Sequence, residues 1–107
     1  MARKIYNKLV RDHIPEIIEA NGQRCAVSTL SDEAYLDALD NKLNEELQEY
    51  QESKSLEELA DLLEVIYAVA AARGSSMEEV ETIRTAKAKL RGGFDKKLML
   101  IYVESDL

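Results

Sequence analysis

Large apolar residues recur at steps of three and four along two consecutive segments, and only a short polar turn separates the segments. The first segment carries this repeat in one stripe, at Leu36, Leu39, Leu43, Leu47 and Tyr50. Because an α-helix has 3.6 residues per turn, such spacing predicts a helix with one apolar face. The second segment is apolar nearly all round after Glu64, which is typical of a central, buried helix. The pattern predicts a helical hairpin.

Capping residues mark where these two helices begin and end. Ser31 is a candidate N-cap, followed by two acidic residues that the helix dipole favours. The polar residues 52–54 end the first helix. Ser55 begins the second, with Glu58 three residues later as its capping-box partner, and Gly74 closes it.

The sequence of the C-terminal part predicts a third long helix followed by an apolar tail. Ser76 and Glu79 form another capping box, and the break at 91–94 ends that helix. The run 98–103 reads Leu-Met-Leu-Ile-Tyr-Val. This run favours either a short strand or an extended arm docked on the core or on a partner subunit.

The N-terminal part predicts less regular structure. Residues 2–11 mix basic and apolar side chains and favour an extended or irregular arm. Pro15 fits the first turn of a short helix that ends at Asn21 and Gly22. The stretch 24–30 is compatible with a strand or a loop.

A chain of 107 residues supports one domain, spanning 1–107, with a small core. The fold class expected is mainly α. A single helical hairpin cannot cover two apolar faces, so we expect a helical bundle completed by self-association into a homo-oligomer, either a dimer or a tetramer.

Charge and composition exclude some classes of binding partner and some cellular compartments. A net charge of −7 argues against binding nucleic acid polymers, which requires clustered lysine and arginine. No apolar run is long enough to span a membrane, and the polar N-terminus lacks a signal-peptide core. The single cysteine, Cys25, gives neither a disulfide framework nor a zinc motif. A cytoplasmic protein without membrane contact is expected.

Two pairs of acidic residues, Glu46 with Glu49 and Glu58 with Asp61, occupy the two helices of the hairpin. A spacing of three puts both members of a pair on the same side of a helix. Four carboxylates can then converge, and two such charges about 4 Å apart repel by about 4 kcal/mol at an effective dielectric of 20. A compensating cation is expected, and oxygen ligands suit Mg²⁺ or Mn²⁺.

Two simpler interpretations remain open for these acids. Glutamate-rich helices are often ordinary solvated surfaces, and Glu58 could serve only as a helix cap. Glu45 lies further round the helix, toward solvent. A di-iron site would require Glu-x-x-His pairs, and the single histidine, His13, lies far from both helices and is expected at the surface.

Basic residues supply the second half of a phosphate site. Lys8 and Arg11 lie near the N-terminus, Lys42 lies beside the acids, and Lys89 and Arg91 precede a double glycine. Lysine and arginine near a carboxylate-bound metal are suited to a polyphosphate. Ordinary surface pairing would explain each of them individually equally well.

The acidic pattern resembles the metal-binding signature of the all-α nucleoside triphosphate pyrophosphatases, the MazG-like and phosphoribosyl-ATP pyrophosphatase group. The resemblance rests on Glu45-Glu46-x-x-Glu49 followed by Glu58-x-x-Asp61. The opening block at 6–16 and Arg91-Gly92-Gly93-Phe94 resemble a narrower branch of small, phosphoribosyl-ATP pyrophosphohydrolase-like house-cleaning proteins.

This resemblance implies Mg²⁺-dependent cleavage of a nucleoside triphosphate between its α and β phosphates. It implies metal ligands at Glu46, Glu49, Glu58 and Asp61. Glu49, with Glu46, would orient or deprotonate the attacking water. The basic residues expected at the polyphosphate are Lys8, Arg11, Lys42, Lys89 and Arg91. Two alternatives remain: the phosphoribosyl-ATP pyrophosphatase of histidine biosynthesis, and a non-catalytic helical interaction module.

Overall fold

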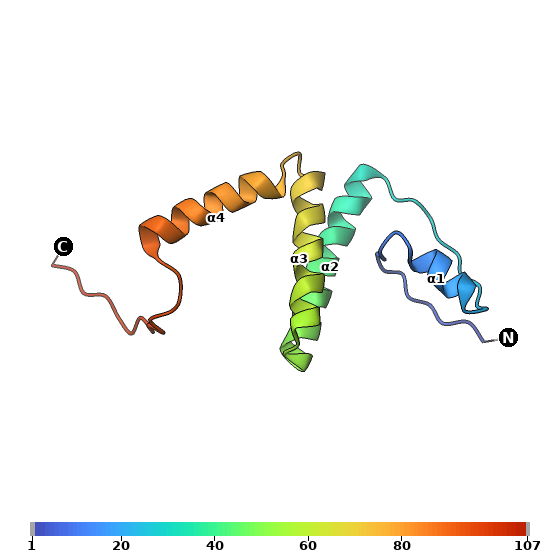
Figure 1. Ribbon diagram of the computed structural model, residues 1–107, viewed down its shortest axis with the longest axis horizontal. Coiled ribbons are helices and arrows are strands. Elements are labelled where there is room, and N and C mark those ends of the chain that lie inside the picture. Colours follow the sequence, from blue (N-terminus) through green and yellow to red (C-terminus); the bar gives the residue numbers. More distant parts are fainter. Residues whose placement is uncertain (1, 107) are drawn as a thin grey trace.

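The computed structural model describes residues 2–106, and this part of the chain is helical and irregular, without strands. Its four helices are α1 (Ile14–Ala20), α2 (Asp32–Ser53), α3 (Leu56–Ala72) and α4 (Met77–Arg91) (Figure 1). The prediction of a mainly α fold is confirmed. None of these helices is long and apolar enough to cross a membrane.

The hairpin of α2 and α3 is the packed centre of the molecule. Its tight turn is made at Lys54, whose φ of 60° lies in the left-handed region. The buried apolar residues of the described chain are Leu39 on α2 with Val65 and Ala70 on α3. One charged residue of the described chain, Glu46, is buried as well. The core therefore lies between the two helices, and an acid lies within it.

The predicted caps form at the start of each long helix. The Oγ atoms of Ser31, Ser55 and Ser76 each accept a hydrogen bond from a backbone N–H three residues later. Gly74 and Gly92 have φ of 80° and 84°, which only glycine adopts readily, and they follow α3 and α4. Local sequence thus sets the helix boundaries.

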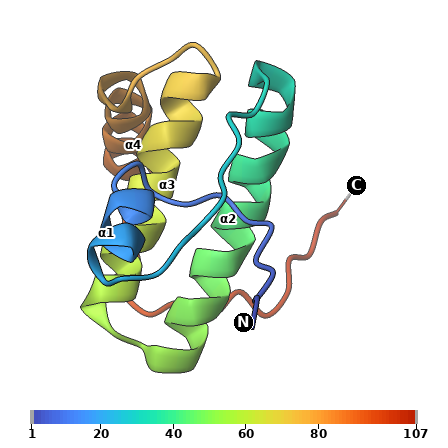
Figure 2. The same cartoon turned by 90° about the vertical axis from the view of Figure 1, so that its right-hand side faces the viewer.

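The N-terminal segment runs along the hairpin before α1 and a loop lead into α2. Figure 2 shows this segment crossing in front of α2 and α3. The stretch 24–30, for which strand and loop both remained open, is a loop. His13 is highly exposed, as predicted. The hairpin therefore has one face beside residues that come from far away in the sequence.

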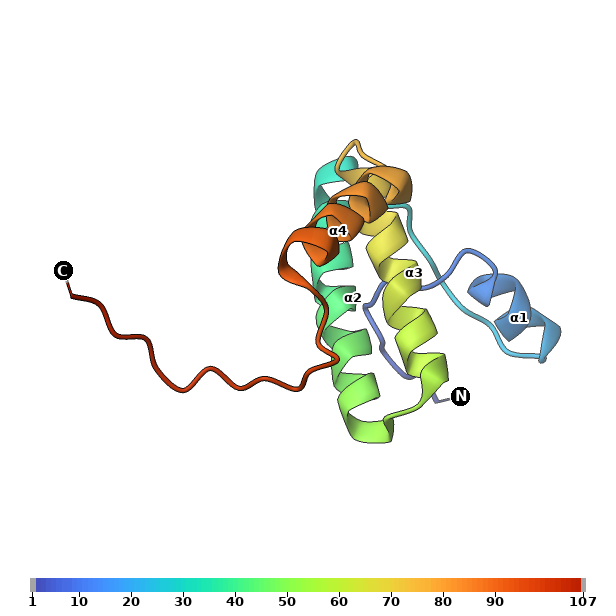
Figure 3. The same cartoon turned by 60° about the vertical axis from the view of Figure 1, so that its left-hand side comes forward.

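α4 leaves the hairpin at its α3 end, and the tail after Arg91 continues away from it as an extended arm (Figures 1 and 3). The molecule measures 69 × 31 × 26 Å, with a radius of gyration of 19.2 Å. A compact domain of about 100 residues has a radius of gyration of about 13 Å. The prediction that α3 is buried all round is wrong within a single chain. Leu63 and Tyr67 remain about half exposed, because no other helix covers them.

Candidate metal centre

Five carboxylates from the two helices of the hairpin meet at one place. Glu45, Glu46 and Glu49 of α2 form one group whose carboxylate oxygens lie within 4.8 Å of one another. Glu46 also belongs to a second group with Glu58 and Asp61 of α3, within the same limit. The antiparallel hairpin therefore brings together both acidic pairs, with Glu46 shared between the groups.

Glu46 lies deepest in this cluster, with its side chain only 8% exposed. Its Oε1 lies 3.4 Å from Lys42 Nζ, whereas its buried Oε2 has no hydrogen-bond partner. Burial, together with the charge of Glu49, raises the pKa of Glu46. A buried carboxylate oxygen without a partner is costly. Glu46 is therefore suited to bind a cation at that oxygen.

Glu58 contributes to the cluster with its carboxylate and to the helix cap with its backbone. The Glu58 N–H donates to Ser55 Oγ at 3.4 Å. The reciprocal capping bond is absent, because the Ser55 N–H donates instead to Ser53 Oγ at 3.2 Å. Glu58 Oε2 is buried without a partner. The side chain of Glu58 is therefore free to bind a cation, while Ser55 still caps α3.

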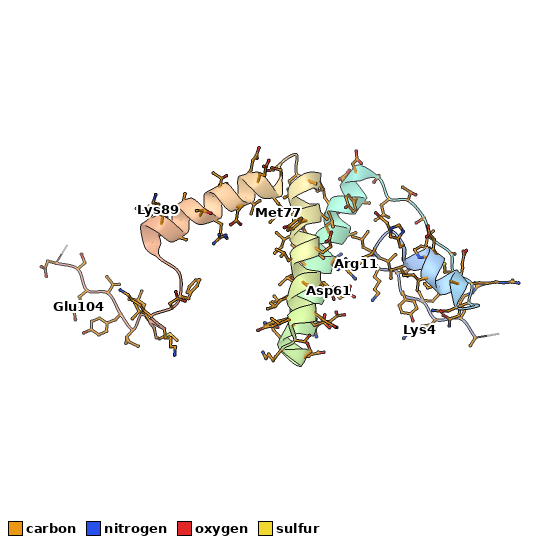
Figure 4. The ribbon with its side chains drawn as sticks, viewed as in Figure 1. Lys4, Arg11, Asp61, Met77, Lys89 and Glu104 are labelled. Atoms are coloured by element: carbon orange, nitrogen blue, oxygen red, sulfur yellow. The ribbon has the colours of Figure 1, made fainter. Side chains whose placement is uncertain are left out.

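Two basic residues of the N-terminal segment pair with the rim of the cluster. Arg11 Nη2 donates to Asp61 Oδ1 at 2.8 Å, and Lys8 Nζ donates to Glu45 Oε1 at 3.0 Å. Figure 4 labels Arg11 and Asp61, which lie next to each other beside the hairpin. The segment that crosses the hairpin thus brings two cations to acids that are 50 and 37 residues away in the sequence.

Glu45 is less exposed than its place on the helix predicted. Its side chain is half-buried and pairs with both Lys8 and Lys42. Burial acts to raise the pKa of Glu45, but hydrogen bonds and charges from these two lysines outweigh it and lower the pKa. The expectation failed because helical periodicity describes α2 alone and contains no information about the segment that covers it.

Two neighbouring acids of the cluster have pKa values shifted in opposite directions. The pKa of Glu46 is raised, whereas that of the adjacent Glu45 is lowered. Lys8 shows the matching effect, since its hydrogen bond to Glu45 raises its pKa despite partial burial. Neighbouring acids with pKa values pushed in opposite directions are common at functional sites, and structural ion pairs also produce them.

The remaining predicted phosphate-binding residues are divided between two places. Lys42 lies at the cluster, 3.3 Å from Glu45 Oε1. Lys89 and Arg91 lie in the last turn of α4, away from the hairpin; Figure 4 labels Lys89 and Asp61 in these separate regions. Within one chain, the structure therefore brings three of the five predicted basic residues to the acids.

Tyr6 is a neighbour of this site that the sequence interpretation did not single out. Its ring centroid lies 4.9 Å from Lys4 Nζ and 5.8 Å from Lys8 Nζ. These distances are within the range of cation–π contact. The order Lys4, Tyr6, Lys8 puts a lysine two residues away on each side of the tyrosine, and this is the signal that could have found it. The segment bends between Tyr6 and Lys8, since Asn7 has a φ of 45°.

The donor set fits a hard divalent cation. Every candidate ligand atom is a carboxylate oxygen, and the cluster contains neither histidine nor cysteine. Two oxygens on opposite sides of one Mg²⁺ are about 4.2 Å apart, given metal–oxygen distances of about 2.1 Å. A separation of at most 4.8 Å therefore requires only small side-chain shifts. Among the candidate ligand residues, Glu46 and Glu58 each have a buried carboxylate oxygen without a hydrogen-bond partner.

Comparisons with known proteins add a partial relative. An uncharacterized protein of Mycolicibacterium smegmatis is 55% identical to this chain over 40 residues, which are 37% of this chain and 41% of that protein. The match thus spans well under half the length of the relative. No protein-family model and no solved structure matches the chain.

Proposed function

We propose that this protein is a Mg²⁺-dependent nucleoside triphosphate pyrophosphohydrolase. It would cleave the bond between the α and β phosphates and release a nucleoside monophosphate and pyrophosphate. Non-canonical nucleotides are the proposed substrates, following the resemblance of the opening block to the house-cleaning branch. Mn²⁺ would substitute for Mg²⁺, since both prefer oxygen ligands.

One observation carries this proposal: two buried carboxylate oxygens without partners, Glu46 Oε2 and Glu58 Oε2, come from facing helices in one cluster. Simple solvated acids would not be buried, and structural acids would be paired. A resident divalent cation accounts for both oxygens. It also accounts for the concentration of like charge around them.

The residues of the cluster divide into two roles. Glu46, Glu49, Glu58 and Asp61 would hold the metal, which would neutralise phosphate charge and make a bound water more acidic. Glu49, which shares one acidic group with Glu45 and Glu46, would orient the attacking water or accept its proton.

The basic residues at the rim account for substrate binding. Lys8, Arg11 and Lys42 lie within hydrogen-bond or ion-pair distance of the acids, so each would reach a phosphate bound to the same metal. Lys8 and Arg11 would exchange a carboxylate partner for a phosphate oxygen. Such exchange conserves their charge pairing while the substrate is bound.

Pyrophosphate release tests the proposal most directly. The purified chain is incubated with a panel of canonical and modified nucleoside triphosphates, with Mg²⁺ or with chelator, and pyrophosphate is detected. We expect Mg²⁺-dependent release from at least one nucleotide. Phosphoribosyl-ATP belongs in the panel, since its selective cleavage would identify the histidine-biosynthesis activity instead.

Thermal unfolding separates the enzyme from a non-catalytic interaction module. A specific native-state cation site must raise the melting temperature when Mg²⁺ or Mn²⁺ is added. An interaction module whose acids only solvate the helices predicts no such shift. Absence of both a metal-dependent shift and pyrophosphate release would refute the proposed function.

A further inference from the structure

Tyr6 presents an exposed aromatic ring beside the acidic cluster. The residue is 61% exposed, and two amino groups lie near its ring centroid, Lys4 Nζ at 4.9 Å and Lys8 Nζ at 5.8 Å. Both groups end flexible side chains, and contacts of this kind are weak at exposed sites. A flat partner can therefore displace either amino group from the ring.

Lys8 connects this ring to the cluster. Its Nζ lies 3.0 Å from Glu45 Oε1 as well as 5.8 Å from the Tyr6 ring centroid. The centroid is therefore no more than about 9 Å from that carboxylate oxygen. Glu45 belongs to the acidic group with Glu46 and Glu49. The ring thus lies beside the proposed metal centre and not in a separate part of the molecule.

The backbone bends between the ring and the lysine. Asn7 has a φ of 45°, in the left-handed region that asparagine tolerates better than most residues. After this bend Lys8 reaches Glu45, whereas Tyr6 before it stays open to solvent. The segment therefore offers one cation to the cluster and one aromatic ring to a ligand.

Side-chain contacts, and not backbone hydrogen bonds, attach this segment to the hairpin. Among the described residues, no backbone hydrogen bond joins residues 2–10 to the helices. The ion pairs of Lys8 with Glu45 and of Arg11 with Asp61 hold the segment where it crosses the hairpin (Figure 2). The ring can therefore change its position when a ligand binds, without the loss of a backbone hydrogen bond to the hairpin.

A nucleotide at the metal centre requires a partner for its base. The acids and the basic residues of the cluster complement a metal ion and phosphates. A base instead offers a flat face, and aromatic side chains stack on such faces. Because one sugar separates the base from the α phosphate, a base on the Tyr6 ring and phosphates at Lys8 can belong to one molecule.

We propose that Tyr6 stacks on the base of the bound nucleotide, while the phosphates of that nucleotide lie at the metal and at Lys8. The inference rests on the proposed function, which supplies the nucleotide as the ligand. Stacking recognises the face of a base and not its edges, so it accepts many bases. Tyr6 therefore selects nucleotides over inorganic polyphosphates and leaves the choice among bases broad.

Binding of two ligands to the full chain in the presence of Mg²⁺ tests this contact. One ligand is α,β-methylene-ATP, whose α–β bridge cannot be hydrolysed; the other is inorganic tripolyphosphate, which has phosphates but no base. Calorimetric titration should show tighter binding of the ATP analogue. Tyr6→Ala should raise the Kd of the analogue about 5- to 150-fold and leave that of tripolyphosphate unchanged.

Two further variants separate the ring from its surroundings. Tyr6→Phe keeps a ring and should restore the affinity for the analogue. Ile5→Ala is the matched control, because Ile5 is the neighbouring residue and is 68% exposed. Its Kd values should equal those of the unaltered chain. If Tyr6→Ala bound the analogue as tightly as Ile5→Ala does, the proposed stacking would be wrong.

Tryptophan fluorescence reports the stacking itself. The chain contains no tryptophan, so Tyr6→Trp places a single indole at the proposed position. A stacked base quenches indole fluorescence, so the analogue should quench this variant and tripolyphosphate should not. Ile5→Trp should be quenched far less. Equal quenching in the two variants would show that the base lies near the segment without stacking at residue 6, and this would overturn the proposal.

These measurements do not require turnover, so the two proposals can fail separately. If Tyr6→Ala weakens binding of the analogue but the chain cleaves no nucleotide, the hydrolase is refuted and the stacking stands. If nucleotides are cleaved but the analogue binds no more tightly than tripolyphosphate, the stacking is refuted and the hydrolase stands. A chain that does not bind the analogue at all also refutes the stacking.

Discussion

Arg11 Nη2 lies 2.8 Å from Asp61 Oδ1, although 50 residues separate them in the sequence. Both side chains are partly exposed, so the pair contributes at most about 1 kcal/mol to stability. Asp61 belongs at the same time to the acidic group with Glu46 and Glu58. A guanidinium and a divalent cation would therefore compete for this carboxylate, and a phosphate would compete for Arg11.

Asp61→Asn should abolish pyrophosphate release with little loss of stability. The substitution keeps the shape of the side chain but removes a ligand charge, and it weakens only a partly exposed ion pair. We expect the free energy of unfolding to change by at most about 1 kcal/mol. Pyrophosphate detection and denaturant unfolding measure the two effects.

Asp40→Asn is the matched control for that substitution. Asp40 also pairs with an arginine across the hairpin, Arg73, at 3.6 Å and with similar exposure, but it lies outside the acidic cluster. Its activity should equal that of the unaltered chain. Full activity in Asp61→Asn would show that the metal site is assigned to the wrong residues.

Glu46→Gln should separate metal binding from folding. Burial raises the pKa of Glu46, so the folded chain disfavours its charge, and a neutral amide should leave the metal-free stability unchanged or higher. The unaltered chain should gain about 2.7 kcal/mol at Mg²⁺ concentrations one hundred times the dissociation constant, and the variant should gain almost nothing. Thermal melts with and without Mg²⁺ measure both quantities. Glu52→Gln, an exposed change on the same helix, should keep the full gain.

Ser55 and Glu58 should give opposite results, because one caps α3 and the other faces the acids. Ser55→Ala removes the oxygen that accepts from the Glu58 N–H and should cost about 1 kcal/mol of stability, while the Mg²⁺ gain is kept. Glu58→Gln should keep the metal-free stability and lose the Mg²⁺ gain. If Glu58→Gln instead destabilised the metal-free helix as Ser55→Ala does, Glu58 would be a cap and not a ligand.

Stability should depend on pH in opposite ways with and without metal. Because the folded-state pKa of Glu46 is raised, its contribution to metal-free stability is full below the unfolded pKa and is lost as pH rises through the folded pKa. Mg²⁺ binds the ionised carboxylate, so the stabilisation by metal should grow over that same rise in pH. Melts at several pH values test both signs, and Glu46→Gln should remove the Glu46 contribution to each trend.

Lys8→Met should raise KM for the nucleotide more than it lowers kcat. Lys8 lies at the rim, 3.0 Å from Glu45, so its proposed contact is with phosphate and not with the attacking water. Loss of one charged hydrogen bond should raise KM by at least about tenfold. Lys4→Met is the control, since Lys4 contacts the same ring of Tyr6 but has no ion pair with the cluster among those of the described chain. An equal effect in both variants would exclude a specific role for Lys8.

The helical segments and their ends could be predicted, because both depend on residues that are close together in the sequence. Ser31, Ser55 and Ser76 each cap the helix that periodicity placed after them. The pairing of Glu46 with Glu58 and Asp61 also followed from spacing, since two short-linked helices pack antiparallel. These are local rules applied to a single hairpin.

The surroundings of the cluster could not be predicted in that way. The half-burial of Glu45 depends on the N-terminal segment, and the free carboxylate of Glu58 depends on Ser53 accepting the bond from the Ser55 N–H. Neither interaction follows from the periodicity of one helix. Each depends on where a distant segment or an irregular turn places one atom.

The amino-acid sequence by itself determined four helices, their caps and a set of acids at matched spacing, because these depend on rotation per residue and on neighbouring hydrogen-bond partners. Only the tertiary structure decided which oxygens are buried without partners, which cations reach them and which apolar faces stay uncovered. Burial and electrostatic energy depend on the positions of all surrounding atoms in space, and those positions include residues far away along the chain.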